Sequence, residues 1–236
     1  MNNAPGSVID PPLSDSSNTN GGLAVFDLDG TLIRGDSFIP FVVGYARSRR
    51  RIRPLLTLPV WVGLYAARLL ADHRAKQRVL VSFFRGEPRT VVAEYATEFT
   101  RQWIMPRIVE PIHSRLTWHL SLGHRVILLS ASPDIYVEAV GNALGIDEVI
   151  CTRIRGTPNH WDGTLDGLNC KGDEKLNRLW RHLGTKTWPA ETYAYGDSQS
   201  DLPVLRWARH GFLVNRQGRM QSVDPLTKKD NLPLPY

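Results

Sequence analysis

The chain of 236 residues is long enough for one sizeable domain, alone or with an insertion. Its 42% apolar and 22% charged residues are ordinary for a globular protein, and its net charge is +6. Two cysteines, Cys151 and Cys170, provide neither a disulfide framework nor a zinc-ligand spacing. We therefore expect a cytoplasmic protein in reducing surroundings.

Residues 1–21 are rich in Asn, Ser, Asp and Pro and contain no apolar run. This composition predicts a disordered tail rather than a secretory signal, because a signal needs a basic start and an apolar stretch. We expect a second tail over residues 221–236.

Five apolar segments predict buried parallel strands, and helical patterns separate most of them. The segments are Leu23–Phe26, Arg125–Leu129, Glu148–Cys151, Thr192–Tyr195 and Gly211–Val214. After the second strand, Ser132 predicts an N-cap and Pro133 the first turn of a helix. Another helix is predicted over Asp173–Leu183. This alternation predicts an α/β fold, a three-layer α/β/α sandwich with a parallel sheet and right-handed crossovers.

Almost a hundred residues, from Leu32 to His124, separate the first two strands and are strongly helical. We interpret residues 35–120 as an inserted helical cap over the carboxyl edge of the sheet. The core then comprises residues 22–34 and 121–220. Within the core, Asp162-Gly163 and Asp166-Gly167 predict turns or a small hairpin.

Two carboxylates follow the first strand directly, in Asp27-Leu28-Asp29-Gly30-Thr31. Gly30 lets the chain turn there. Because open α/β sheets bind ligands beyond the carboxyl ends of their strands, we expect both side chains in a site. Asp27 can act as a nucleophile and Asp29 as a proton donor, and together they can hold a divalent metal. The alternative is a surface turn rich in Asp and Gly.

Polar residues follow two other strands. Ser130 follows the second strand, where a hydroxyl beside a helix N-terminus can bind phosphate; local turn bonding is the alternative. Asp197 and Asp201 follow the fourth strand, one helical turn apart on the same side. Four converging carboxylates are costly unless a cation lies among them, and an oxygen-only ligand set favours Mg²⁺.

Two lysines, Lys171 and Lys175, lie at the start of the helix before the fourth strand. Either can neutralise a phosphoryl oxygen, and a solvated surface lysine is the alternative for each.

This order of motifs resembles the haloacid dehalogenase (HAD) superfamily, in particular its phosphoserine phosphatase-like branch, over roughly Leu23 to Val214. The resemblance is carried by Asp27-Leu28-Asp29-Gly30-Thr31, by Ser130, and by Gly196-Asp197 with Asp201. It implies a HAD-like sheet, a helical cap, and Mg²⁺-dependent hydrolysis of phosphomonoesters through an aspartyl-phosphate.

The resemblance also assigns roles to individual residues. Asp27 is the implied nucleophile, and Asp29 the general acid and base. Mg²⁺ is bound by Asp27, the backbone carbonyl of Asp29 and Asp197, with Asp201 in support. Ser130 and a lysine bind phosphoryl oxygens. The Asn169-Cys170-Lys171-Gly172-Asp173-Glu174-Lys175 pattern favours Lys175, as in some relatives, whereas relatives with a lysine directly before Gly favour Lys171.

The substrate is indicated less directly. Five arginines, Arg47, Arg49, Arg50, Arg51 and Arg53, precede the nearly apolar stretch Leu55–Leu70. This stretch is shorter than the roughly 20 residues that span a bilayer, but beside arginines it can lie on an anionic membrane surface. The alternative is a buried cap helix with a solvated basic turn.

We therefore expect a peripheral contact with the cytoplasmic membrane face through residues 47–70. The expected substrate is a lipid phosphate such as phosphatidylglycerophosphate. The alternative is a soluble phosphorylated metabolite, phosphoserine or histidinol phosphate. Asp36 falls where phosphoserine phosphatases have a substrate-facing Glu, although a helix cap also explains it. A non-catalytic module whose arginines bind nucleic acid or a partner is disfavoured by the intact set of carboxylates.

Overall fold

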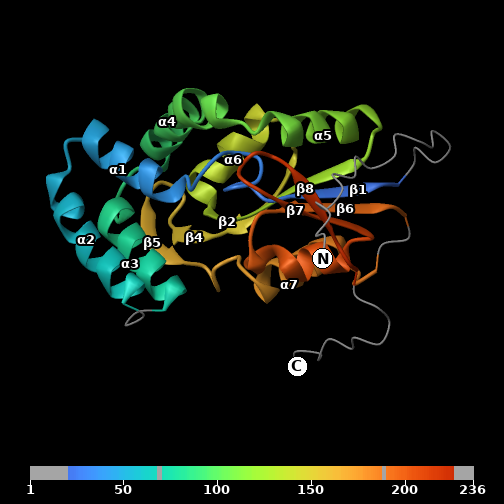
Figure 1. Ribbon diagram of the computed structural model, residues 1–236. Coiled ribbons are helices and arrows are strands. Elements are labelled where there is room, and N and C mark those ends of the chain that lie inside the picture. Colours follow the sequence, from blue (N-terminus) through green and yellow to red (C-terminus); the bar gives the residue numbers. More distant parts are fainter. Residues whose placement is uncertain (1–20, 68–70, 188–189, 226–236) are drawn as a thin grey trace, which may run out of the picture.

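The computed structural model describes residues 21–67, 71–187 and 190–225 (Figure 1). Nearly all of the expected N-terminal tail, and residues 226–236, lie outside the described residues. Within them, a six-stranded sheet has the order β3-β2-β1-β6-β7-β8. The strands are β1 (Leu23–Phe26), β2 (Arg125–Pro133), β3 (Glu148–Thr152), β6 (Thr192–Gly196), β7 (His210–Val214) and β8 (Met220–Val223). All neighbours are parallel except β7 and β8, so the expected parallel strands are confirmed.

The central strand β1 is buried on both faces, as expected for a parallel sheet between two helical layers. Its alternate residues enter different cores: Ala24 and Phe26 face one, and Leu23 and Val25 face the other. Helices α5 (Glu110–Ser121) and α6 (Asp134–Ala143) contribute apolar residues to the first core. Helices α7 (Asp173–Leu183) and α8 (Leu202–Trp207) contribute to the second. The predicted α/β/α sandwich is therefore confirmed.

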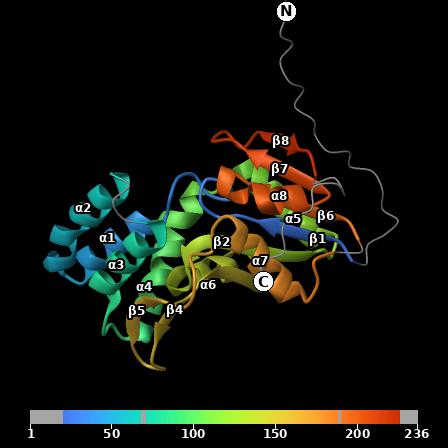
Figure 2. The same ribbon diagram turned by 90° about the horizontal axis from the view of Figure 1, so that it is seen from below.

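The segment between β1 and β2 is helical, as its sequence predicts. It contains α1 (Phe38–Ser48), α2 (Ile52–Ala66), α3 (Asp72–Phe84), α4 (Arg89–Phe99), a π-helical turn (Thr100–Ile104), a 3-10 turn (Met105–Arg107) and α5. Helices α1, α2 and α3 gather beyond one end of the sheet in both views (Figures 1 and 2). Ile33 and Ile108 pair where the chain leaves and re-enters the sheet region. Helix α5 follows that pairing and packs against β2, although it lies within the range expected for the cap.

A two-stranded antiparallel hairpin, β4 (Ile154–Gly156) and β5 (Trp161–Leu165), stands beside α3. The hairpin is as expected, but its turn spans residues 157–160, and Asp162-Gly163 lies inside β5. Close packing explains this glycine. A Cβ atom on Gly163 would lie 2.7 Å from the Cα of Val81 in α3, and the backbone φ there is +80°.

Two further boundaries differ from the expectation. Strand β2 continues to Pro133, so Ser130 lies within it, and α6 begins only at Asp134; Ser132 therefore does not cap that helix. At the other end of the chain, β8 extends the sheet to Val223, beyond the expected boundary at residue 220. The carboxamide of Asn215 accepts hydrogen bonds from the amides of Gln217 and Arg219, which closes the turn that returns β8 to β7.

Candidate active site

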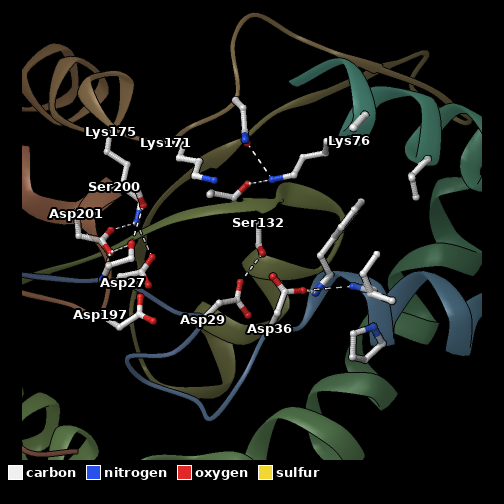
Figure 3. Close-up of a pocket in the computed structure, with 18 of the residues that line it drawn as sticks. Asp27, Asp29, Asp36, Lys76, Ser132, Lys171, Lys175, Asp197, Ser200 and Asp201 are labelled. Carbon is white, nitrogen blue, oxygen red and sulfur yellow. Dashed lines mark hydrogen bonds and ion pairs between the residues drawn. The ribbon is translucent and has the colours of Figure 1, made fainter. Parts of the chain in front are cut away.

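The carboxyl ends of β1, β2 and β6 surround a pocket of about 640 Å³ that also meets the helices of the insertion. Asp27 and Asp29 reach it from the end of β1, Ser132 from β2, Lys175 from α7, and Asp197 and Asp201 from the segment after β6 (Figure 3). Segments far apart in the sequence therefore supply one site, at the sheet edge where the strand pattern places it.

A buried lysine joins two of the carboxylates. The Nζ atom of Lys175 donates hydrogen bonds to Oδ1 of Asp27 and to Oδ1 of Asp201, each at 2.5 Å (Figure 3). Lys175 is only 2% exposed. Burial lowers its pKa, but the charges of Asp27 and Asp201 outweigh burial and leave the pKa of Lys175 above its ordinary value. Lys175 therefore remains a cation in the floor of the pocket.

Asp27 is itself buried, and its other oxygen accepts a hydrogen bond of 3.3 Å from the hydroxyl of Thr31. Burial raises the pKa of Asp27 and the ammonium of Lys175 opposes the rise. Lys171, the other lysine that the sequence indicates, is exposed and lines the pocket wall. The structure thus brings Lys175 rather than Lys171 against Asp27.

Asp29 is held separately, by two serines. Its Oδ1 accepts the backbone N–H of Ser37 at 2.7 Å, and its Oδ2 accepts the hydroxyl of Ser132 at 2.6 Å. The hydroxyl of Ser37 is in turn 2.8 Å from that of Tyr136. Burial and then the charge of Asp36 raise the pKa of Asp29, and the hydrogen bonds from Ser132 and Ser37 oppose them. A raised pKa suits a carboxyl group that has to carry a proton.

The two serines of β2 have different positions. Ser132, which the sequence indicated only as a helix cap, faces the pocket and contacts Asp29. Ser130 is 1% exposed, does not line the pocket, and accepts the backbone N–H of Ser132 at 3.0 Å through its hydroxyl. In this arrangement Ser130 orders the backbone that carries Ser132.

Three carboxylates form a cluster suited to a cation. Oxygen atoms of Asp27, Asp197 and Asp201 all lie within 4.8 Å of one another. A Cβ atom on Gly30, where φ is +83°, would lie 2.0 Å from Oδ2 of Asp197, so only glycine leaves room for this carboxylate. Burial and then the charge of Asp201 raise the pKa of Asp197 to about 6. An oxygen-only donor set fits Mg²⁺.

Asp29 lies outside this cluster, and Asp201 has other partners besides it. The side chain of Asp29 is directed to its two serines, which leaves its backbone carbonyl as the expected ligand. Asp201 accepts the N–H and hydroxyl of Ser198 at 3.1 and 2.7 Å through Oδ2, while its Oδ1 accepts Lys175. Asp201 therefore fixes Lys175 and the loop after β6.

Two residues link the insertion to the site. Asp36 accepts the backbone N–H of Phe38 at 2.9 Å, as a helix cap does, and also lines the pocket. Lys76 of α3 was not indicated by the sequence. Its ammonium donates to the carbonyl of Ala131 at 2.8 Å and to the side chain of Asn169 at 2.9 Å (Figure 3). No local pattern marks such a lysine, because its partners are 55 and 93 residues away.

Comparison with known proteins identifies the family of the chain. The family model for haloacid dehalogenase-like hydrolases matches residues 24–206. The chain is 30% identical to protein CicA of Caulobacter vibrioides over 78% of this chain and 81% of that protein. It is 24% identical to a histidinol-phosphatase of Neisseria meningitidis serogroup C, over 84% of this chain and 92% of the relative.

Solved structures show the same fold. A protein of unknown function from Bordetella pertussis Tohama I matches with a TM-score of 0.70 and 24% identity, over 80% of this chain and 87% of that one. A phospho-aspartyl intermediate analogue of phosphoserine phosphatase matches with a TM-score of 0.52 and 19% identity, over 79% and 82%. The chain therefore belongs to the haloacid dehalogenase-like hydrolase family, and its fold is that of the phosphoserine phosphatases.

Proposed function

We propose that this enzyme is a Mg²⁺-dependent phosphomonoester hydrolase that works through an aspartyl-phosphate on Asp27. The observation that carries the proposal is the separation of the two first-motif carboxylates. Asp27 lies against the cation Lys175, whereas Asp29 accepts hydrogen bonds from Ser37 and Ser132 and has no contact with that cation in the described structure. One carboxylate is thereby suited to attack and the other to carry a proton.

In the first step, a carboxylate oxygen of Asp27 attacks phosphorus, and the bond between phosphorus and the alcohol oxygen breaks. The proton of Asp29 passes to that alcohol oxygen, so a neutral alcohol leaves. In the second step, water attacks the phosphorus of the aspartyl-phosphate and gives a proton to the Asp29 carboxylate. The bond from phosphorus to Asp27 breaks, which releases inorganic phosphate and restores both side chains.

Other residues of the site hold the phosphoryl group. Lys175 neutralises charge on its oxygens, and Lys171 on the pocket wall is a further candidate for phosphate binding. Ser130, the serine that the sequence indicates for phosphate binding, lies outside the pocket lining and would act through the backbone of Ser132. Asp27, Asp197 and the backbone carbonyl of Asp29 would hold Mg²⁺, with Asp201 in support. When bound, the ion offsets the negative charge shared by these carboxylates and the substrate.

The test is phosphate release by the full chain from p-nitrophenyl phosphate, with Mg²⁺ and after chelation. We expect turnover to disappear with chelation and to return with Mg²⁺. Asp27→Asn should lower kcat on the order of 10⁴-fold or more, because the nucleophile is lost. Acid-quenched wild type should carry a phosphoryl group on the Asp27 peptide by mass spectrometry. Turnover that survives Asp27→Asn contradicts the proposal; ligand binding that responds to salt alone favours a binding module.

For the substrate we propose a lipid phosphate, such as phosphatidylglycerophosphate, reached at an anionic membrane surface. The support comes from the outer face of α2, where Ile52, Leu56 and Val60 recur every fourth residue and are 67%, 72% and 55% exposed. Exposed arginines at positions 47, 49, 50 and 53 adjoin this face. Apolar side chains beside cations are the composition of a peripheral membrane contact.

The described helices include none that is long and apolar enough to cross a bilayer. The predicted segment 55–70 is mixed in character, since Leu58 is buried in the core, Leu56 is exposed, and residues 68–70 lie outside the described residues. Arg51 differs from the other arginines because it pairs with Glu87 and binds the carbonyl of Phe83. It is therefore not part of the proposed contact.

A soluble metabolite is the second candidate, favoured by the histidinol-phosphatase among the relatives and the phosphoserine phosphatases among the similar folds. A panel of micellar phosphatidylglycerophosphate, phosphoserine and histidinol phosphate separates the candidates, with Asp27→Asn as the blank. Turnover confined to the micellar substrate supports the lipid. Preference for either metabolite contradicts it.

A further inference from the structure

We infer that the pocket selects phosphomonoesters whose alcohol places an alkyl or aryl group next to the ester oxygen. The inference rests on the proposed function and names the chemical class of the leaving alcohol. It comes from the inner wall of the pocket, which is distinct from the outer face of α2, so it holds for water-soluble esters as well as lipids.

The pocket has two chemically different halves. The half formed by the sheet edge carries the carboxylates, Ser132 and Lys175. The half formed by the insertion is dominated by apolar side chains from its first helices. These include Phe38 and Ile39 of α1, Trp61 and Val62 of α2, and Ala75 and Val79 of α3. A substrate with its phosphate at the carboxylates therefore directs its alcohol towards an apolar wall.

Two charged residues of the insertion, Asp36 and Lys76, also line this half, and both have hydrogen-bond partners within the protein. The carboxylate of Asp36 accepts the N–H of Phe38, and the ammonium of Lys76 reaches across to Ala131 and Asn169 of the core. Lys171 lines the core side. Asp36 and Lys171 are the groups that a zwitterionic alcohol would use, so phosphoserine is the most informative competitor.

Contact between the alkyl chain of a substrate and the apolar wall should be measurable as a change in kcat/KM. Each methylene buried against the wall should raise kcat/KM about fourfold, the equivalent of about 0.8 kcal/mol. A charged group at the same place has to leave water without a partner on the apolar wall, so it should lower kcat/KM. The gain should end when the alkyl chain fills the pocket.

The experiment measures kcat/KM for methyl, ethyl, propyl, butyl and hexyl phosphate below their micelle concentrations, with Mg²⁺ present. We expect a rise from methyl to butyl phosphate. Propyl phosphate should exceed phosphoserine, its three-carbon zwitterionic counterpart, at least about tenfold. A flat series, or a preference for phosphoserine, overturns the inference while the phosphatase proposal stands. No release from any ester overturns both.

Substitutions in the apolar wall test whether it causes the dependence of kcat/KM on chain length. Trp61→Ala and Val62→Ser should flatten the dependence of log kcat/KM on chain length. A general loss of activity lowers every value in the series equally and leaves this slope unchanged. Leu120→Ser is the matched control, because Leu120 is a partly exposed aliphatic residue of α5 that does not line the pocket; it should keep the slope. Val62 is 44% exposed, so Val62→Ser carries the test if Trp61→Ala fails to fold by circular dichroism. An unchanged slope in Val62→Ser contradicts the assignment.

Discussion

Lys175 is the cation that joins two carboxylates of the site, Asp27 and Asp201. It is buried, and it donates to Asp27 and Asp201, which are 148 and 26 residues away in the chain. A charge in such a place is stable only with its partners, and the partners depend on it in turn. The same ion pairs therefore serve stability and orient the nucleophile.

Replacing Lys175 by Met should lower the free energy of unfolding by about 3–5 kcal/mol, because Asp27 and Asp201 are left buried without a counter-charge. Urea unfolding at neutral pH measures this change. The matched control is Lys171→Met, which removes an exposed lysine of the same pocket and should change stability by less than about 1 kcal/mol, because the contacts of an exposed charge are worth little. Equal effects of the two substitutions would contradict the central position of Lys175.

Asp29→Asn should lower the rate of alcohol release about 10²- to 10⁴-fold, because the general acid is lost. The loss should be smaller for p-nitrophenyl phosphate than for propyl phosphate, since nitrophenolate leaves without a proton. Rapid-quench measurement of the first turnover separates this step from hydrolysis of the intermediate. Lys171→Met is the control, because this lysine is a candidate ligand of the phosphoryl group, so its effect should not depend on the leaving group. The same loss on both esters would argue against proton donation by Asp29.

Among the elements, helix α2 has one face that lines the pocket and one that is exposed. Trp61 and Val62 line the pocket, whereas Ile52 and Leu56 lie on the exposed outer face beside arginines. The helix also contains Pro59. A single helix thus connects the proposed leaving-group wall with the proposed membrane contact.

The double substitution Ile52→Ser, Leu56→Ser should weaken binding to vesicles that contain anionic lipid, because the outer face loses most of its apolar surface. Arg49→Gln with Arg53→Gln should weaken binding by about 1 kcal/mol for each charge and reduce its salt dependence. Vesicle sedimentation gives both affinities. Leu168→Ser, at a 60% exposed position outside α2, should bind as wild type does. Wild type that stays in the supernatant with these vesicles would contradict the membrane contact.

For the molecule as a whole, acid stability should depend on a histidine remote from the pocket. His119 of α5 is fully buried, and its ring nitrogens lie 3.0 Å from the hydroxyl of Tyr195 and 2.9 Å from Nδ1 of His124. Burial, and then the charges of His124 and Arg115, lower the pKa of His119 to about 3. The folded protein therefore keeps this ring neutral where the unfolded chain protonates it.

Because the folded pKa lies below the unfolded value of about 6.5, stability is fully present above pH 6.5 and is lost as the pH falls towards 3. At pH 4.5 the loss from His119 is about 2–3 kcal/mol. His119→Gln keeps a polar side chain without this titration, so its loss of stability between pH 7 and 4.5 should be smaller by that amount. Urea unfolding at both pH values is the measurement. Identical losses in the variant and wild type would rule out this contribution.

Much of the fold and of the candidate site could be predicted from local patterns in the sequence. Alternating apolar strands and helices sufficed for the three-layer fold, since burial of a strand between two helical layers leaves a continuous apolar run in the sequence. Asp27, Asp29, Asp197 and Asp201 were indicated because each follows a strand, and parallel strands bring their carboxyl ends to one edge.

The sequence by itself thus determined the strands, the helical insertion and the residues that follow the strands, because these depend on spacing along the chain. The tertiary structure decided what depends on distances between remote segments: that Lys175 rather than Lys171 meets Asp27, that Ser132 binds Asp29 instead of capping α6, and that Lys76 reaches Ala131. It also decided which residues of α2 line the pocket and which are exposed. Such contacts depend on how whole helices and strands pack together. The sequence around each partner therefore contains no local pattern that predicts the contact.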